Sequence, residues 1–213
     1  MSNQQRALPK EEQPLEPDFY FSRAQQDVLG EMGNICMGTA ATALNALLDF
    51  KVIITTPKLA IHTWKSLASE HRDPLVVVAV QYTSGVEGSN ILLLKDYDVA
   101  LITDRLMGVD TPQDHKNVVL NDDHLSCIRE VMNQMVGASA TSLASMLNMA
   151  VNISTPISSY ETIREQRLKT LIPEEPLLLK ISFKMEIMGL LSSEIMQVLP
   201  VGFARALADK MLG

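Results

Sequence analysis

A carboxylate and a carboxamide stand three residues apart at two points of the sequence, as Glu31 and Asn34 and again as Glu130 and Asn133. An amide is not a general base, but it can both accept from and donate to one water and so fix its position. Hydrolysis of an activated phosphoryl group needs this contribution, because its loose transition state depends on positioning and electrostatics. The two pairs are therefore the candidate catalytic residues.

Each pair belongs to a longer unit, which begins at Asp27 and ends at Pro57 in the first copy. The second copy begins 99 residues later at Ser126 and ends at Pro156. From the glutamate to the proline of each copy, 11 of 27 positions are identical. A repeat of that length indicates two structural copies of one unit.

Helical spacing places the polar members of each unit on one face. Asp27, Glu31 and Asn34 are related as i, i+4 and i+7, so on a helix they form one stripe about 10 Å long. A single Glu-x-x-Asn is typical of the polar face of any amphipathic helix. Two copies in register, each followed at the same distance by a proline, favour a functional stripe. For Pro57 itself we favour a structural role, as a break in a strand.

The complete pattern, [Asp/Ser]-x3-Glu-x2-Asn-x22-Pro, resembles the signature of the CheC/FliY/CheX family of chemotaxis phosphatases, and both copies match it in full. Flanking sequence at 30–38, 132–137 and 193–200 is most similar to the phosphatase region of FliY-type flagellar switch proteins. The resemblance extends from about Ser22 to the last residue. Two alternatives stay open, a stand-alone CheC-like protein and the phosphatase core of a longer FliY-type protein.

The resemblance implies an enzyme that hydrolyses the phosphoaspartate of a CheY-type response regulator in chemotaxis. Asn34 and Asn133 would orient the attacking water, and Glu31 and Glu130 would bind the active-site lysine of the receiver by a charge-assisted contact. No cofactor is expected on this chain, because Mg²⁺ would be carried by the partner receiver domain. The other signature positions, Asp27, Ser126, Pro57 and Pro156, are expected to be accessory.

A non-catalytic function is the main alternative. The chain would then be a binding or scaffold protein of the flagellar switch, or of the adaptation system that contains the deamidase CheD. A purely structural duplicated domain is a third, weaker interpretation. The intact Glu/Asn pairs in both halves favour the enzyme, since a scaffold has no chemical need to keep them.

Composition restricts the class of protein further. The net charge is −7 and no run of Lys or Arg occurs, so nucleic acid and anionic membrane surfaces are not expected as partners. No apolar run is long enough to span a membrane, and the two cysteines, Cys36 and Cys127, are not clustered. We therefore expect a cytoplasmic protein without a metal site, and the resemblance adds the flagellar motor switch as its location.

The predicted fold is α+β. Residues 1–21 are expected to form a disordered lead-in, followed by one CheC-like domain of two repeats, 22–108 and 117–213, joined by a polar linker. Each repeat should contain a long helix, a strand pair, a hairpin and a closing helix. Helices are predicted over 23–48, 98–107, 122–149 and 201–212. Strands are predicted over 51–56, 58–63, 74–84, 89–95, 150–155, 176–187 and 190–198, with a turn at 85–88. Two such repeats predict a pseudo-twofold domain with an antiparallel-rich sheet and the two long helices on one face.

Overall fold

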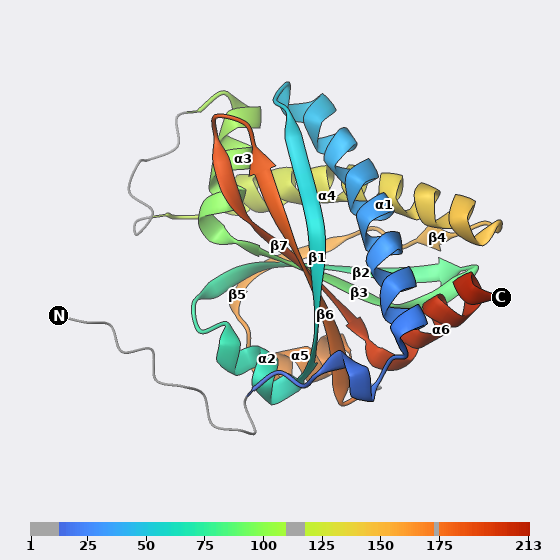
Figure 1. Cartoon of the computed structure of the whole chain (residues 1–213). Coiled ribbons are helices and arrows are strands. Elements are labelled where there is room, and N and C mark those ends of the chain that lie inside the picture. The colour runs from blue at the N-terminus through green and yellow to red at the C-terminus, as the bar shows by residue number, and fades with distance from the viewer. Residues whose placement is uncertain (1–12, 110–117, 173–174) are drawn as a thin grey trace.

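The computed structural model describes residues 13–109, 118–172 and 175–213, in which helices pack around one curled antiparallel sheet (Figure 1). The helices are α1 (Arg23–Leu48), α2 (Trp64–Glu70), α3 (Asp96–Met107), α4 (Asp122–Leu147), α5 (Glu165–Leu171) and α6 (Val201–Leu212), preceded by the short 3₁₀ turn η2 (Pro17–Phe19). The strands are β1 (Val52–Thr63), β2 (Pro74–Ser84), β3 (Val86–Lys95), β4 (Asn152–Ile153), β5 (Ile157–Thr162), β6 (Leu177–Ile187) and β7 (Leu191–Pro200).

The two long helices, α1 and α4, begin and end in the same way. Ser22 and Gln25 form a reciprocal capping box at the start of α1, and the Asn121 side chain caps α4. Each helix has 26 residues and ends at a left-handed residue, Asp49 with φ 56° and Asn148 with φ 50°. These local signals set both helix lengths. The two helices also start 99 residues apart, so each stripe occupies the same position on its helix.

The sheet interleaves the strands of the two halves. Its order is β1-β6-β7-β3-β2-β4, with β5 also beside β2, and every pairing is antiparallel. At the offset of 99 residues, β4 and β5 together correspond to β1. β1 pairs with β6 of the second half, and β4 and β5 pair with β2 of the first half. At the centre, Leu92 of β3 lies opposite Gln197 of β7. Leu92 and Gln197 are 105 positions apart in the sequence, and the first residues of α3 and α6 are separated by the same number. A local twofold axis therefore passes between β3 and β7.

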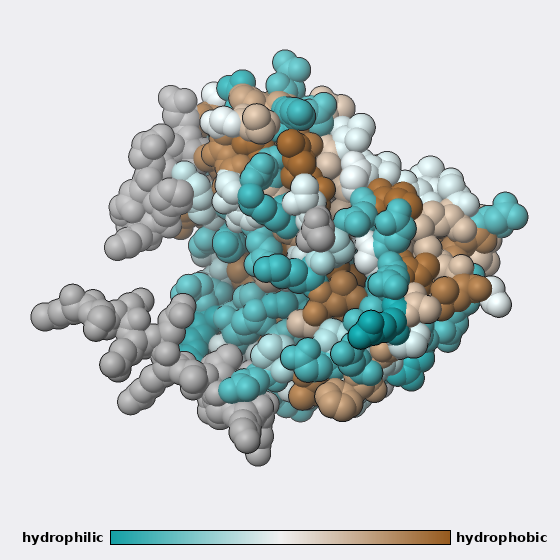
Figure 2. Space-filling model, in the orientation of Figure 1, coloured by the Kyte–Doolittle hydropathy of each residue, from teal (hydrophilic) through white to brown (hydrophobic). Residues whose placement is uncertain are grey.

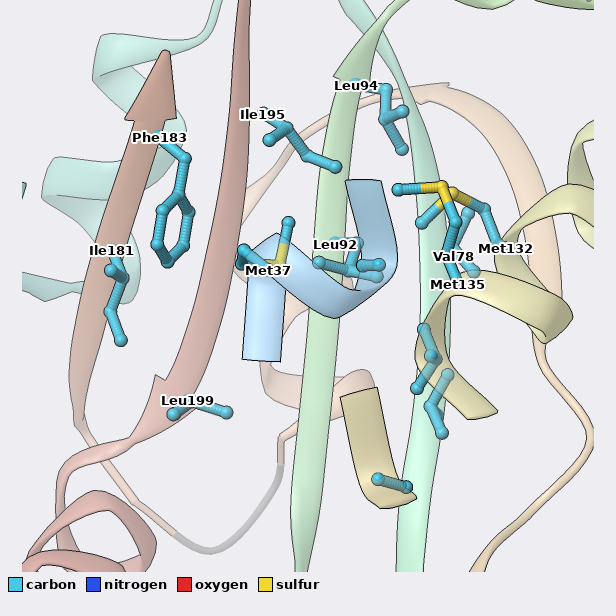
Figure 3. Packing of buried hydrophobic residues seen from close by; sticks show 14 of the residues in the cluster. Met37, Val78, Leu92, Leu94, Met132, Met135, Ile181, Phe183, Ile195 and Leu199 are labelled. Atoms are coloured by element: carbon cyan, nitrogen blue, oxygen red, sulfur yellow. The ribbon is translucent and has the colours of Figure 1, made fainter. Parts of the chain in front are cut away.

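Alternation along the strands divides the core into two layers. In β2, Val76 and Val78 belong to the larger cluster, which α1, α4, α3 and α6 cover, whereas Leu75 and Val77 face the cluster beneath α2 and α5. Met37 of α1 and two methionines of α4 lie near β3 residues in the larger cluster (Figure 3). The predicted fold class is confirmed, and α2 and α5 add a smaller layer on the second face.

The small residues of the long helices meet where α1 and α4 pack together. Ser139 Oγ donates to the carbonyl of Cys36 at 2.9 Å, and Thr39 Oγ1 and Ser142 Oγ are 2.6 Å apart. A β carbon added at Gly38 or Gly137 would meet no atom within 4 Å. The close packing therefore uses the alanine, serine and threonine positions and not these two glycines.

Three predicted segments differ from the structure. Leu15 pairs with Ile61 through two backbone hydrogen bonds and Phe21 is buried, so the predicted disorder is wrong for residues 13–21. Residues 1–12 and linker residues 110–116 lie outside the described ranges. The predicted turn at 85–88 is shorter in the structure, because Gly85 at φ +81° reverses the chain alone and Ser84 pairs directly with Val86, where β3 begins. The strand predicted at 150–155 is limited to β4.

Candidate active site

The first stripe lies on the exposed face of α1. Asp27, Glu31 and Asn34 are all exposed, whereas Leu29 and Met32, which alternate with them, are buried against the sheet. The helix therefore holds the carboxylate and the amide at the surface while its other face is fixed by packing. Within the described residues, no side chain forms a hydrogen bond with the side chain of Asn34.

The second stripe repeats this arrangement on α4. Ser126, Glu130 and Asn133 are exposed, while Ile128 and Met132 are buried in the core. The structure therefore brings glutamate and asparagine together within each half, on one helix. It keeps the two pairs on different helices, as two separate candidate sites, which we call site 1 on α1 and site 2 on α4. Figure 1 shows these two helices covering the same side of the molecule.

The two signature prolines lie in the strands that follow the helices. Pro57 is at a register shift of β1, between Thr55 and Lys58, and its Cγ is 3.9 Å from where a β carbon of Gly33 would stand. Pro156 is buried, between β4 and β5. β1 continues through Pro57, so this proline lies at a bulge and does not break the strand as the sequence predicted. In site 1 the proline lies close beneath the Glu/Asn helix.

Site 2 has polar neighbours that site 1 lacks. Gln134 Nε2 donates to Glu130 Oε1 at 3.1 Å, whereas the equivalent of Gln134 in site 1 is Ile35, a side chain with 39% of its surface exposed. Arg129 next to Glu130 corresponds to Gly30. Ile35 and Gln134 were not among the site residues predicted from the sequence. A position-by-position comparison of the two copies would have found them.

Two buried carboxylates, Asp98 and Asp104, belong to α3, and a second group of buried ionisable side chains lies beneath α2. There Lys180 forms an ion pair with Glu70, whose other carboxylate oxygen is 3.4 Å from His62 Nε2. Burial lowers the pKa of His62 to about 4. Burial alone would raise the pKa of Glu70, but the hydrogen bond and charge of Lys180 lower it below its ordinary value. None of its ion pairs involves a residue of the two stripes.

Other reactive groups offer little chemistry. Burial raises the pKa of the Cys36 thiol to about 11, so this cysteine is protonated at neutral pH and a poor nucleophile. In the part of the chain that the structure describes, no three His, Cys, Asp or Glu side chains are grouped so as to hold a metal ion. None of the helices in the same ranges is long and apolar enough to cross a membrane.

Comparison with known proteins decides the family. The sequence profile of the CheC-like family matches residues 25–61 and 124–160, which are the two windows that contain the stripes. The crystal structure of Thermotoga maritima FliY superposes with a TM-score of 0.80 at 34% identity, covering 90% of this chain and 98% of that one. The chain belongs to the CheC/FliY family.

Two further comparisons give a curated relative of this CheC/FliY chain and a solved structure that shares its fold. The flagellar motor switch phosphatase FliY of Bacillus subtilis (strain 168) is 36% identical over 192 residues, which are 90% of the chain but 50% of that protein. The chain thus spans about half the length of this curated relative. FliM in an H. pylori FliG–FliM complex has the same fold, with a TM-score of 0.71 at 12% identity, over 89% of this chain and all of that one.

Proposed function

We propose that this chain is a phosphatase that hydrolyses the phosphoaspartate of a CheY-type receiver in bacterial chemotaxis. The observation that carries the proposal is the pair of exposed Glu/Asn stripes, held in the same register on two equivalent packed helices. The name of the B. subtilis relative, a flagellar motor switch phosphatase, supports the activity and a location at the motor.

In the proposed mechanism the chain supplies orientation and no nucleophile. The amide of Asn34 or Asn133 inserts beside the phosphoaspartate and holds a water in line with the phosphorus. Glu31 or Glu130 binds the receiver's active-site lysine, which anchors the helix at the reaction centre. Mg²⁺ would be held by the receiver, where it would neutralise charge on the phosphoryl group. Because each pair stands on a capped and packed helix, the backbone that carries it needs little reorganisation before reaction.

The proposal is tested by measuring loss of phosphate from a phosphorylated CheY-type receiver with wild type, Asn34→Ala, Asn133→Ala and the double variant. Removing one oriented amide should lower the rate at its own site by about 10²–10³. Each single variant should therefore keep the activity of the other site, and the double variant should lose nearly all acceleration. The same change at an exposed asparagine outside the stripes, Asn45→Ala, is the matched control and should be neutral.

The alternative function is a non-catalytic binding module of the flagellar switch. It is favoured by the fold shared with FliM, which is seen in complex with FliG in H. pylori. Wild type that binds the phosphorylated receiver without accelerating its dephosphorylation would support this alternative. Titration of the Asn34→Ala/Asn133→Ala double variant with a FliG-type switch protein or with CheD would then identify the partner.

A further inference from the structure

The glutamates of the two sites have different neighbours one helical turn further on. Position i+4 from the glutamate is Ile35 in site 1 and Gln134 in site 2, and both are on the exposed face of their helix. This is a neighbouring position on the helix surface, so its side chain lies beside the carboxylate. The two sites therefore present different surfaces to a partner, apolar beside Glu31 and polar beside Glu130.

In site 2, the side chain at this position is hydrogen-bonded to the carboxylate of the glutamate. Gln134 Nε2 donates to Glu130 Oε1 at 3.1 Å, so a partner's ammonium group must compete with this amide. The adjacent Arg129 adds a positive charge that repels such a group, and site 1 has Gly30 in its place. Within the described residues, no side chain donates a hydrogen bond to Glu31. Its carboxylate can accept a cationic partner without losing an existing contact.

In site 1, the neighbour is an apolar side chain at the surface. Ile35 is 39% exposed and directly follows Asn34. The surface over α1 in Figure 2 is largely hydrophilic, with hydrophobic residues reaching it in small separate areas. A partner that covers Asn34 also covers Ile35, and burial of its exposed part strengthens association. Site 2 offers an amide there, which gains little from being covered.

We propose that Ile35 and Gln134 are specificity-determining residues that give the two sites different affinities for the phosphorylated receiver. Ile35 is a docking residue of site 1, and Gln134 weakens site 2 by holding Glu130. Site 1 then works at low receiver concentration and site 2 at high concentration, which widens the range over which the protein responds. This inference rests on the proposed phosphatase function.

The test uses variants in which only one site is active. Asn133→Ala isolates site 1 and Asn34→Ala isolates site 2, and KM and kcat for the phosphorylated receiver are measured for each. We expect the lower KM for site 1. Ile35→Gln in the first background should raise KM roughly three- to sevenfold, from loss of apolar burial scaled by the exposed fraction. Gln134→Ile in the second should lower KM by about 1.4- to 2.3-fold from release of the carboxylate alone, and further if the new apolar side chain is covered by the receiver. Neither change should alter kcat more than about twofold, because neither side chain touches the reacting atoms.

Controls separate docking from general effects. Met188→Gln removes another exposed apolar side chain, and Thr141→Ile adds one to the exposed face of α4 beyond the site. Neither should change KM. If both single-site proteins are active but the two substitutions leave KM unchanged, the inference is wrong while the proposed function stands. If no single-site protein accelerates dephosphorylation, the proposed function itself fails.

Discussion

Replacement of Gly33 by alanine probes how α1 is seated on the sheet beneath site 1. A β carbon at this position would stand 3.0 Å from Cζ and 3.2 Å from Cε1 of Phe183, a β6 residue with no exposed surface. The ring is enclosed by the core and cannot move aside freely. By contrast, a β carbon at Gly30, three residues earlier on the same helix, would meet no atom within 4 Å. The same substitution therefore has opposite expected effects at the two positions.

The magnitudes follow from helix propensity and packing. Alanine is favoured over glycine inside a helix by about 1 kcal/mol, which Gly30→Ala should gain in full. Gly33→Ala gains the same amount but overpacks the core, at a cost of about 1–3 kcal/mol. For a chain of this size 1 kcal/mol corresponds to about 2–4 °C in Tm. Gly30→Ala should thus melt about 2–4 °C above wild type, and Gly33→Ala about 2–12 °C below Gly30→Ala.

Denaturant and thermal unfolding of the two variants measure this difference. The variant Phe183→Leu, which shortens the opposing side chain, completes a double-mutant cycle with Gly33→Ala. The penalty at Gly33 should shrink in that background, with a coupling energy of about 0.5–3 kcal/mol. Equal stabilisation by both glycine substitutions, or no coupling to Phe183, would refute the close packing of α1 against β6 at this point.

Three further predictions concern the helix caps and the buried cluster. Ser22→Ala should lower the free energy of unfolding by about 0.5–2 kcal/mol, because it removes the capping box of α1. Asn121→Ala should have an effect of the same size on α4. Arg23→Ala is the control and should be nearly neutral in the same denaturation assay. The folded-state pKa of His62, about 4, lies below its ordinary value of 6.5, so between these pH values the unfolded chain binds a proton that the folded chain does not. Stability should therefore fall as the pH drops from 7 to 4. His62→Gln should make this slope shallower but not abolish it, because burial also lowers the pKa of His71 below 6.5 and the lowered pKa of Glu70 adds to the loss near pH 4.5 and below. An unchanged slope would contradict the assignment to His62.

Local signals in the sequence predicted the long helices and the residues on their exposed faces. Ser22 with Gln25 marks the start of α1, and the spacing of Asp27, Glu31 and Asn34 determines that they share a face. These features depend on residues within one or two helical turns, so they need no knowledge of the rest of the chain. The same applies to α4, and the two Glu/Asn pairs could therefore be identified as candidate sites from residue types and spacing alone.

Contacts between residues far apart in sequence could not be read in this way. The pairing of β1 with β6 and of β5 with β2 exchanges strands between the halves, while the duplication alone is equally compatible with each half pairing its own strands. Hydrophobic alternation shows that a strand has a buried face but does not name its neighbour. The single-residue reversal at Gly85 likewise depends on the backbone conformation that the paired strands impose.

The sequence by itself determined the two Glu/Asn stripes, the ends of their helices to within two residues and the α+β class, because propensity, capping and periodicity act over short distances. Only the tertiary structure decided how the two halves interlock and that Gly33 lies against Phe183 and Pro57. These depend on packing in space and on the rotamers that packing selects, and a linear pattern does not contain them.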